Sequence, residues 1–390
     1  MVSKILVRLL KATVTTIVII QTLFLIYIAA GALFGTRSII SSDRHANTTV
    51  LKTGAGARPV SKIAERRKSA VASIPVRKRK VRYVLKKQKN YGEYFKKRDQ
   101  IVNSYLSEVK WILNPGCKSP EAPHLLVLVT SRVGDKLTRD RLRITWGTSS
   151  FTGEWTHGRK LPRYAISIYY LVGKPPPDGG ESETNLQGEF KDFADLIVAD
   201  FDDVYGNLTL KTALALRWAT EHCPDAAYVM KADSDIFVNV PKLLEDVNAA
   251  NLGLENKIMG YVNGPRPLVI RGGRYGVPVG QYPFEVYPPY LAGNAYVMHA
   301  RTASRLYRAA LRTRLINMED VYFTGILATI EGVRLFHNRR FANNVIHRRR
   351  SSEQIACWIK RNTSVIVTNV DRWQMREIWE RLEMTPNPCS

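Results

Sequence analysis

The chain of 390 residues has few cysteines, and none of the four stands in a Cys-x-x-Cys pair. No Cys or His neighbours have the spacing of a zinc cluster, so the sequence argues against such a site. An even number of cysteines, all placed after residue 100, favours two disulfides in an oxidising compartment over four buried free thiols. Sequence alone leaves three pairings open among Cys117, Cys223, Cys357 and Cys389.

Acidic residues are scarce in the first hundred positions. Residues 1–35 contain three bases and no acid, and residues 36–100 contain 19 Lys or Arg against four acids. The formal charge of +24 is therefore concentrated before residue 101, and the remaining 290 residues carry only +6. A strongly basic protein often binds nucleic acid, but here the larger part of the chain is only mildly basic. We expect no nucleic-acid partner.

Charged residues are absent between positions 12 and 35. These 24 residues, at about 1.5 Å each, make a helix of roughly 36 Å, enough to cross a hydrocarbon core of about 30 Å. The apolar run of a cleaved signal peptide, the competing interpretation, normally spans only about 7 to 15 residues. Lys4, Arg8 and Lys11 hold the N-terminus in the cytoplasm. The sequence predicts a cytoplasmic tail (1–11), a transmembrane signal anchor (12–35) and a lumenal remainder.

Residues 36–100 are rich in Lys, Arg, Ser and Ala and have no sustained periodicity. Like charges repel, so we expect a basic flexible stem, and the upstream anchor disfavours a nuclear-targeting patch. Asn47, Asn207 and Asn362 each begin an N-glycosylation acceptor pattern, which agrees with a lumenal location. Exposure favours use of the stem site at Asn47. The folded domain is expected at 101–390.

Short apolar runs mark the folded domain as α/β. Runs at 125–130, 164–172, 196–199 and 227–230 lack alternation, as in strands buried on both faces of a mostly parallel sheet. Helical spacing of apolar residues over 208–222 and 375–382 predicts two helices. The expected architecture is a Rossmann-like sandwich that binds its ligand beyond the carboxyl ends of the strands.

Two carboxylates follow the last of these predicted strands. Asp233 and Asp235 stand at i and i+2, so in an extended segment both side chains project to one side. Paired carboxylate oxygens suit Mn²⁺ or Mg²⁺ shared with a diphosphate. A solvated acidic turn is the alternative, but the flanking apolar runs favour a site.

A second acidic pair, Glu319 and Asp320, precedes a segment at 323–330 that looks helical. Acids at a helix start are commonly caps or dipole partners, so by itself this pair reads as structural. His337 is likewise more typical of a structural or exposed histidine than of a ligand. Context is required to give these residues a function.

That context comes from seven blocks that occur in order along the chain. Together they resemble the animal β-1,3-galactosyltransferases, within the inverting β-1,3-glycosyltransferases of glycosyltransferase family 31. The blocks are 114–117 (NPGC), 139–147 (RDRLRITWG), 170–173 (YLVG), 189–212, 228–239, 287–296 (YPPYLAGNAY) and 318–325 (MEDVYFTG). The resemblance implies a GT-A glycosyltransferase fold, a single-pass type II protein of the Golgi membrane, a UDP-sugar donor, a glycan acceptor and Mn²⁺, with Mg²⁺ as the alternative ion.

The resemblance also implies a role for each matched residue. The base is expected at Asp320, with Glu319 second, and the metal at Asp235 with Asp233. The roles expected for the remaining residues are contact with the nucleotide by Arg139, Arg143 and Trp146, contact with the donor by Asp233 and Ser234, and a third metal ligand at His337. Trp146 serves equally well as a core residue.

The Lys-x-Asp-Ser-Asp sequence looks more like the galactose-transferring members than the N-acetylglucosamine-transferring ones. We therefore expect transfer of galactose from UDP-galactose, with inversion, to the 3-hydroxyl of terminal N-acetylglucosamine on glycoproteins or glycolipids. The alternatives are a β-1,3-N-acetylglucosaminyltransferase and a catalytically inactive, lectin-like relative. Ala292-Gly293-Asn294, where relatives have Ser-Gly-Gly or Ser-Gly-Thr, and Gly276 depart from the family pattern and leave the acceptor open. The sequence carries no signal for or against a homo-oligomer.

Overall fold

The computed structural model describes residues 94–96, 98–117, 122–162, 165–175, 180–252, 256–265, 267–341, 350–384 and 389. The expected cytoplasmic tail (1–11), membrane anchor (12–35) and most of the stem (36–100) lie outside these residues. Among the residues that the structure describes, no helix is both long enough and apolar enough to cross a membrane.

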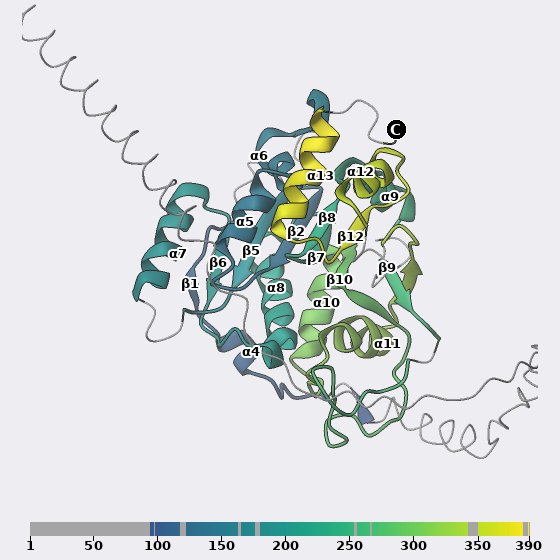
Figure 1. The fold of residues 1–390 in the computed structure, drawn as a ribbon. Helices are drawn as coiled ribbons and strands as arrows, with labels where there is room; N and C mark the ends of the chain where they lie inside the picture. The colour runs from purple at the N-terminus through teal and green to yellow at the C-terminus, as the bar shows by residue number, and fades with distance from the viewer. Residues whose placement is uncertain are drawn as a thin grey trace, which may run out of the picture. The chain divides into compact units, whose positions relative to one another are not determined.

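Strands and helices alternate along the described chain (Figure 1). The strands are β1 (Trp111–Leu113), β2 (Leu125–Thr130), β3 (Glu154–Trp155), β4 (Arg159–Lys160), β5 (Ile166–Val172), β6 (Leu196–Ala199), β7 (Tyr228–Asp233), β8 (Ile236–Val238), β9 (Lys257–Asn263), β10 (Tyr290–His299), β11 (Arg334–His337) and β12 (Ile366–Thr368). The α-helices are α4 (Tyr105–Glu108), α5 (Lys136–Arg143), α6 (Ser149–Thr152), α7 (Gly180–Phe193), α8 (Leu208–His222), α9 (Val240–Ala250), α10 (Ala300–Ala310), α11 (Ala328–Ile330), α12 (Ser352–Lys360) and α13 (Arg372–Met384). Single turns are η1 (Trp146–Thr148), η2 (Thr156–Gly158) and η3 (Tyr205–Asn207), and η4 (Val321–Leu327) is π-helical.

The central sheet has eight strands in the order β1-β6-β5-β2-β7-β10-β9-β11. The strands β6, β5, β2 and β7 run parallel, whereas β10 is antiparallel to both of its neighbours. All six residues of β2 are buried, as the absence of alternation predicted. The α/β interpretation and its four strands are confirmed, and the expected helix at 208–222 is α8. The sheet is more mixed than expected, because the half beyond β7 is largely antiparallel.

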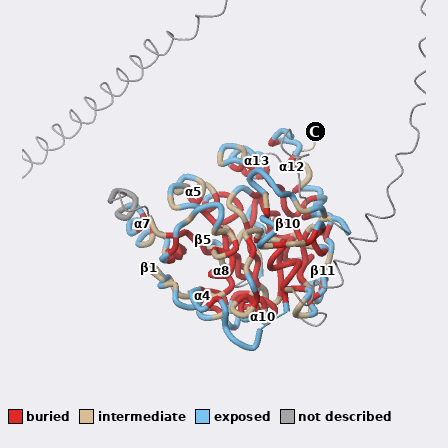
Figure 2. The backbone as a smooth tube through the Cα atoms, turned by 90° about the horizontal axis from the view of Figure 1, so that it is seen from below, coloured by how far each residue is buried: buried red, intermediate tan, exposed pale blue. Residues whose placement is uncertain are grey.

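Helices cover both faces of this sheet (Figure 1). One face packs against α8, α10 and η4, and the other against α5, α9, α12 and α13. Buried residues run through the centre of the molecule and exposed residues lie on its outer segments (Figure 2). This two-sided cover explains the continuous apolar runs in the parallel strands. It leaves the carboxyl ends of β2 and β7 as the place where polar side chains can gather.

The packed part of the chain begins before residue 101. Phe95 is fully buried, with its ring centroid 5.5 Å from that of Tyr282 and 6.4 Å from that of Phe284. The domain therefore includes residues that the sequence placed in the stem.

Two disulfides link distant segments of the described chain. Cys117 is bonded to Cys223, 106 residues away, and Cys357 to Cys389, 32 residues away. The prediction of two disulfides is confirmed, and the structure selects one of the three pairings. The first bond ties the segment after β1 to the end of α8, and the second ties α12 to the C-terminal segment.

Candidate functional site

A cleft of about 620 Å³ opens at the carboxyl ends of β2 and β7. Both acidic pairs line it, although Asp235 and Glu319 lie 84 positions apart in the sequence. Asp233 ends β7 and Asp235 follows it in the next turn, whereas Glu319 and Asp320 precede η4. The fold thus brings the two pairs together at the sheet edge where α/β proteins bind ligands.

Asp233 is held by two neighbours inside the sheet. Its Oδ1 accepts a hydrogen bond from Lys231 Nζ at 2.6 Å and another from Thr130 Oγ1 at 3.2 Å. Thr130 is the last residue of β2 and lies directly across from Asp233 in the parallel register. The Asp233 carboxylate therefore has a fixed orientation at the cleft wall.

Lys231 lies between the two acidic pairs with only 4% of its surface exposed. Its Nζ is 2.5 Å from Gly293 O and 3.7 Å from Glu319 Oε2, in addition to its bond with Asp233. Burial opposes the charged form, but the carboxylates of Asp233 and Glu319 outweigh it and raise the pKa of Lys231. Lys231 therefore carries a buried positive charge shared by both pairs. Sequence reasoning missed this residue as part of the site; a charged side chain inside an otherwise apolar strand was the available signal.

An irregular segment of β10 gives Lys231 its third partner. The register between β10 and β9 shifts between Leu291 and Tyr296, so the residues between them leave the regular ladder. Gly293 lies in this segment, and a Cβ on it would stand 3.1 Å from Glu319 Oε2 and 3.2 Å from Asp320 Cβ. The absence of a side chain at this position lets the backbone approach both carboxylates.

The residues of the second pair differ in their surroundings. Glu319 is buried, and its Oε1 accepts a 2.5 Å hydrogen bond from Tyr296 Oη. Burial is the largest cause of its raised pKa, which Lys231 and Tyr296 partly offset. Protein groups thus enclose Glu319, and we assign it a structural role beside Asp320.

Asp320 is half-buried and lines the cleft. Its Oδ1 accepts a hydrogen bond from the backbone N–H of Val321 at 2.8 Å, which fixes the carboxylate at the start of η4. Burial, followed by repulsion from Glu319, raises the pKa of Asp320 to about 7. A carboxylate with this pKa can accept a proton near neutral pH, as a general base must.

Asp235 is exposed in the turn after β7. Its backbone carbonyl accepts a hydrogen bond from Val370 N–H, and the next carbonyl, of Ile236, accepts one from Trp146 Nε1 at 3.0 Å. Partial loss of hydration in the cleft, followed by repulsion from Asp233, raises the pKa of Asp235 to about 6. Trp146 is fully buried, so it acts as a core residue that supports this turn from behind. Ser234 lies in the same turn and is half-buried.

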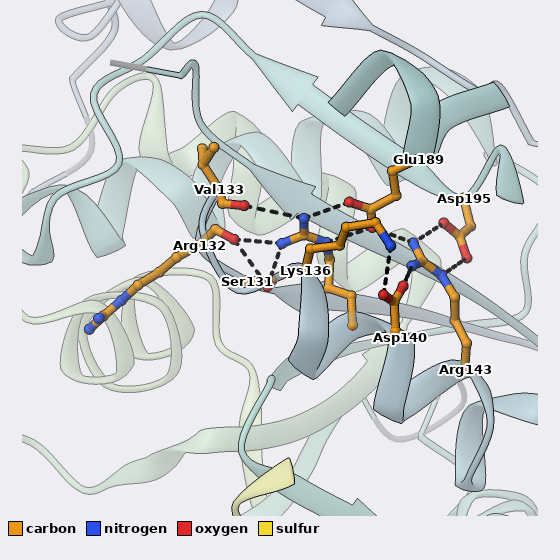
Figure 3. Close-up of polar contacts among 9 residues, drawn as sticks. Ser131, Arg132, Val133, Lys136, Asp140, Arg143, Glu189 and Asp195 are labelled. Carbon is orange, nitrogen blue, oxygen red and sulfur yellow. Dashed lines mark hydrogen bonds and ion pairs between the residues drawn. The ribbon is translucent and has the colours of Figure 1, made fainter. Parts of the chain in front are cut away.

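The guanidinium groups of Arg139 and Arg143 take part in a network of ion pairs within the protein (Figure 3). Both are buried, and their guanidinium groups bind carboxylates within the protein: Arg139 binds Glu189, and Arg143 binds Glu189 and Asp195 at 2.7 Å each. Burial opposes the charge on Glu189, but the two arginines outweigh it and lower its pKa. Neither of the two side chains expected to contact the nucleotide lines the cleft, because both are buried and bound by carboxylates of the protein.

Arg139 supports the cleft indirectly (Figure 3). It donates to the carbonyl oxygen of Arg132 at 2.5 Å and to Ser131 Oγ at 3.2 Å, in the loop that follows β2. Lys211 Nζ donates to the Ser131 carbonyl at 2.5 Å from the side of α8. The buried ion network thus fixes the loop next to Thr130. Breaking such a network typically costs about 3–5 kcal/mol, since it leaves a buried charge unpaired.

His337 does not join the acidic pairs. It ends β11, which β9 and β10 separate from β7, and its Nδ1 accepts a hydrogen bond from the backbone N–H of Val262 at 3.0 Å. Its ring packs edge-on against Tyr261. The expected third metal ligand is therefore not at the site, and among the described residues no group of three His, Cys, Asp or Glu side chains could hold a metal ion.

The donor atoms that remain still fit one kind of metal. Asp235 presents an exposed carboxylate to the cleft, and Asp233 stands beside it with one oxygen engaged by Lys231. Mg²⁺ and similar hard cations are commonly held by one or two carboxylates when a substrate diphosphate and water complete the shell. The carboxylates of Asp233 and Asp235 therefore suit a hard divalent cation that binds together with the diphosphate of a nucleotide.

Comparisons with known proteins identify similar sequences. The family model described as Galactosyltransferase matches residues 137–339. The human protein named UDP-GalNAc:beta-1,3-N-acetylgalactosaminyltransferase 1 is 34% identical over 212 residues, which cover 52% of this chain and 59% of that protein. Beta-1,3-galactosyltransferase 1 of Mus musculus is 33% identical over 223 residues, covering 56% and 64%. The chain thus spans about three fifths of the length of these curated relatives.

Among solved structures, an apo structure of the WbbM bifunctional glycosyltransferase aligns with a TM-score of 0.37 and 13% identity, over 70% of this chain and 51% of that one. Similarity at that level supports no statement about function.

Replacing Lys231 with Met should leave buried carboxylates without their shared counter-charge. We expect the free energy of unfolding at pH 8 to fall by about 3 kcal/mol. The loss should be smaller at pH 5, because Glu319 and Asp320, whose pKa values are raised, then take up protons. Urea denaturation at both pH values measures this. Lys174→Met, in an exposed ion pair, is the control and should change little; an equal loss at both pH values would contradict the shared-charge role.

Proposed function

This chain belongs to the galactosyltransferase family, and on that premise we propose that it is an inverting β-1,3-galactosyltransferase with a GT-A fold. It transfers galactose from UDP-galactose to the 3-hydroxyl of an acceptor glycan that ends in N-acetylglucosamine. One observation carries the proposal: two acidic pairs, distant in sequence, meet in one cleft on either side of the buried Lys231.

UDP-N-acetylgalactosamine is the second candidate donor. It is supported by the relatives named as β-1,3-N-acetylgalactosaminyltransferases, which are as similar to this chain as the relative named as a galactosyltransferase. The Lys-x-Asp-Ser-Asp sequence around Asp233 favours galactose over N-acetylglucosamine, and the donor panel described below separates galactose from N-acetylgalactosamine. The intact carboxylates disfavour an inactive, lectin-like protein, because binding alone does not require two acidic pairs. The N-acetylglucosaminyltransferase alternative is one outcome of the donor panel described below.

The reaction needs a base, because a neutral sugar hydroxyl is a poor nucleophile. Asp320 accepts the proton of the acceptor 3-hydroxyl as its oxygen forms a bond to the anomeric carbon of the donor. The bond from that carbon to the UDP oxygen breaks in the same displacement, so the α-linked donor gives a β-linked product. General-base assistance of this kind is typically worth about 10²- to 10⁴-fold in rate.

The leaving diphosphate gathers negative charge. Asp235, with Asp233, would hold the divalent ion, proposed as Mn²⁺, with Mg²⁺ as the alternative. When bound, the ion supplies Lewis-acid stabilisation of the diphosphate. Lys231 orients Asp233 through its 2.6 Å bond and keeps Glu319 in place beside the base. One ammonium group thus contacts both a carboxylate of the proposed metal site and the residue next to the base.

We also propose that the protein works in the lumen of the Golgi apparatus as a single-pass type II membrane protein anchored through residues 12–35. Two features of the chain support this. The uncharged run follows three basic residues, and the four cysteines form two disulfides, which require an oxidising compartment.

The direct test of the activity is a matrix of donors and acceptors with linkage analysis of each product. UDP-galactose, UDP-N-acetylgalactosamine and UDP-N-acetylglucosamine are offered with acceptors that end in N-acetylglucosamine, N-acetylgalactosamine or galactose. We expect a β-1,3-linked galactosyl product on N-acetylglucosamine. A different preferred donor would correct the specificity, and donor hydrolysis without transfer to any acceptor would reject the proposed activity.

Asp320→Asn should lower the transfer rate by about 10²- to 10⁴-fold while leaving UDP binding intact. The base must be deprotonated, and the pKa of Asp320 is raised to about 7. The wild-type rate should therefore rise with pH through about 7 and then level off. Initial rates from pH 5 to 9 and UDP titrations measure both effects; near-normal turnover in a folded variant would reject Asp320 as the base.

Asp235→Ala should remove the Mn²⁺-dependent part of UDP binding. Calorimetric titration of UDP with and without Mn²⁺ measures it, and thermal unfolding checks that the variant is folded. Asp225→Ala is the matched control, because Asp225 is exposed near the opposite end of β7. Retention of the Mn²⁺ effect in Asp235→Ala would exclude this carboxylate as a principal ligand.

A further inference from the structure

The cleft carries apolar side chains as well as carboxylates. Leu268, Ile270 and Tyr275 line it with 75%, 53% and 52% of their surface exposed, and Tyr205, also exposed, lines it too. Single exposed apolar residues are ordinary on protein surfaces, but several that line one cleft indicate a binding surface. We name Leu268, Ile270, Tyr275 and Tyr205 the apolar rim.

The backbone conformation exposes the two aliphatic side chains of the apolar rim. Leu268 pairs with Val286 and the Val269 N–H binds Glu285 O, so the segment is extended. Alternate residues of an extended segment point to opposite sides. Val269 accordingly packs against the core, whereas Leu268 and Ile270 are exposed to the cleft.

The segment is also held in place. Arg271 donates to the carbonyl oxygens of Val277 at 2.9 Å and Tyr282 at 2.7 Å, and also to that of Phe284. Val277 N–H in turn binds the Ile270 carbonyl at 2.9 Å. On the other part of the rim, the Arg274 guanidinium stacks 4.3 Å from the Tyr205 ring centroid. A surface fixed in this way loses little conformational entropy on binding.

The occupant of this rim follows from the chemistry of the cleft. Tyrosine rings can stack on a sugar, but the hydroxyl groups of a sugar gain little from contact with two exposed aliphatic side chains. An alkyl chain would bury apolar surface against both side chains, and removing apolar surface from water is favourable. The donor's diphosphate would bind together with the metal at Asp235 and Asp233, and we assign the rim to the acceptor. The anchor expected at 12–35 adds that the protein works beside a bilayer, where acceptors with apolar tails are found.

We propose that the acceptor is a glycolipid, and that Leu268 and Ile270 bind its apolar aglycone close to the sugar that receives the new residue. This inference rests on the proposed transferase activity and specifies the class of acceptor. The two side chains contact substrate away from the reacting atoms, so they determine specificity and are not part of the catalytic machinery.

The test compares octyl and methyl β-N-acetylglucosaminide as acceptors for the full-length chain in isolated membranes, with UDP-galactose as donor. We expect kcat/KM to be about tenfold higher for the octyl glycoside. In the double variant Leu268→Ser/Ile270→Ser this ratio should fall to about 1–2, while the KM for UDP-galactose stays unchanged. Comparing the ratio between variant and wild type cancels partitioning of the octyl glycoside into the membrane.

Val279→Ser is the matched control, because Val279 is 62% exposed near the rim but does not line the cleft. It should keep the wild-type ratio. A wild-type ratio near one, or an unchanged ratio in the double variant, overturns the glycolipid assignment and leaves the transferase activity standing. A glycopeptide with the same terminal sugar that loses activity selectively in the double variant would assign the rim to polypeptide and overturn the proposal. Absence of product from every donor and acceptor would reject both proposals together.

Discussion

One buried ammonium group holds the candidate site together. Four acidic side chains line a single cleft, and without a positive charge among them their mutual repulsion and loss of hydration would favour the protonated forms. Lys231 supplies that charge from the middle of the sheet, within 2.6 Å of Asp233 and 3.7 Å of Glu319. It can do so only because β7 ends where the segment before η4 returns to the sheet. The chemistry of the site thus depends on the topology of strands.

The ionic interactions divide into two kinds. Those around Lys231 open onto the cleft, whereas the network of Arg139 and Arg143 is closed within the protein and fixes the loop after β2. Arginine suits the second task, because its planar fork binds a carboxylate in two places. A motif shared with a family of enzymes therefore need not touch the substrate. Here it stabilises the wall against which a substrate can lie.

Sequence reasoning located the parallel strands, α8 and both acidic pairs, because apolar runs and carboxylates after a strand are local signals. It could not choose among the disulfide pairings, which depend on how distant segments meet. It predicted that Arg139 contacts a ligand, because a motif shows which residue types recur. A motif does not show which charged side chains of the protein bind those residues. His337 was misplaced for a similar reason: its position along the chain gave no information that β9 and β10 separate it from β7. Lys231 was missed because its three partners come from different segments.

Gly293 has a consequence for how such a site can diverge. Any side chain at this position would press on Glu319 and Asp320, whose atoms lie 3.1 Å and 3.2 Å from the place of a Cβ. Ala292 and Asn294 flank it on the same irregular segment of β10 and also line the cleft. Mutations at these two neighbours can reshape the space offered to a substrate while the carboxylates keep their positions. Substitutions at Ala292 and Asn294 can therefore change the shape of the cleft without disturbing the backbone contact that Gly293 makes with the two carboxylates.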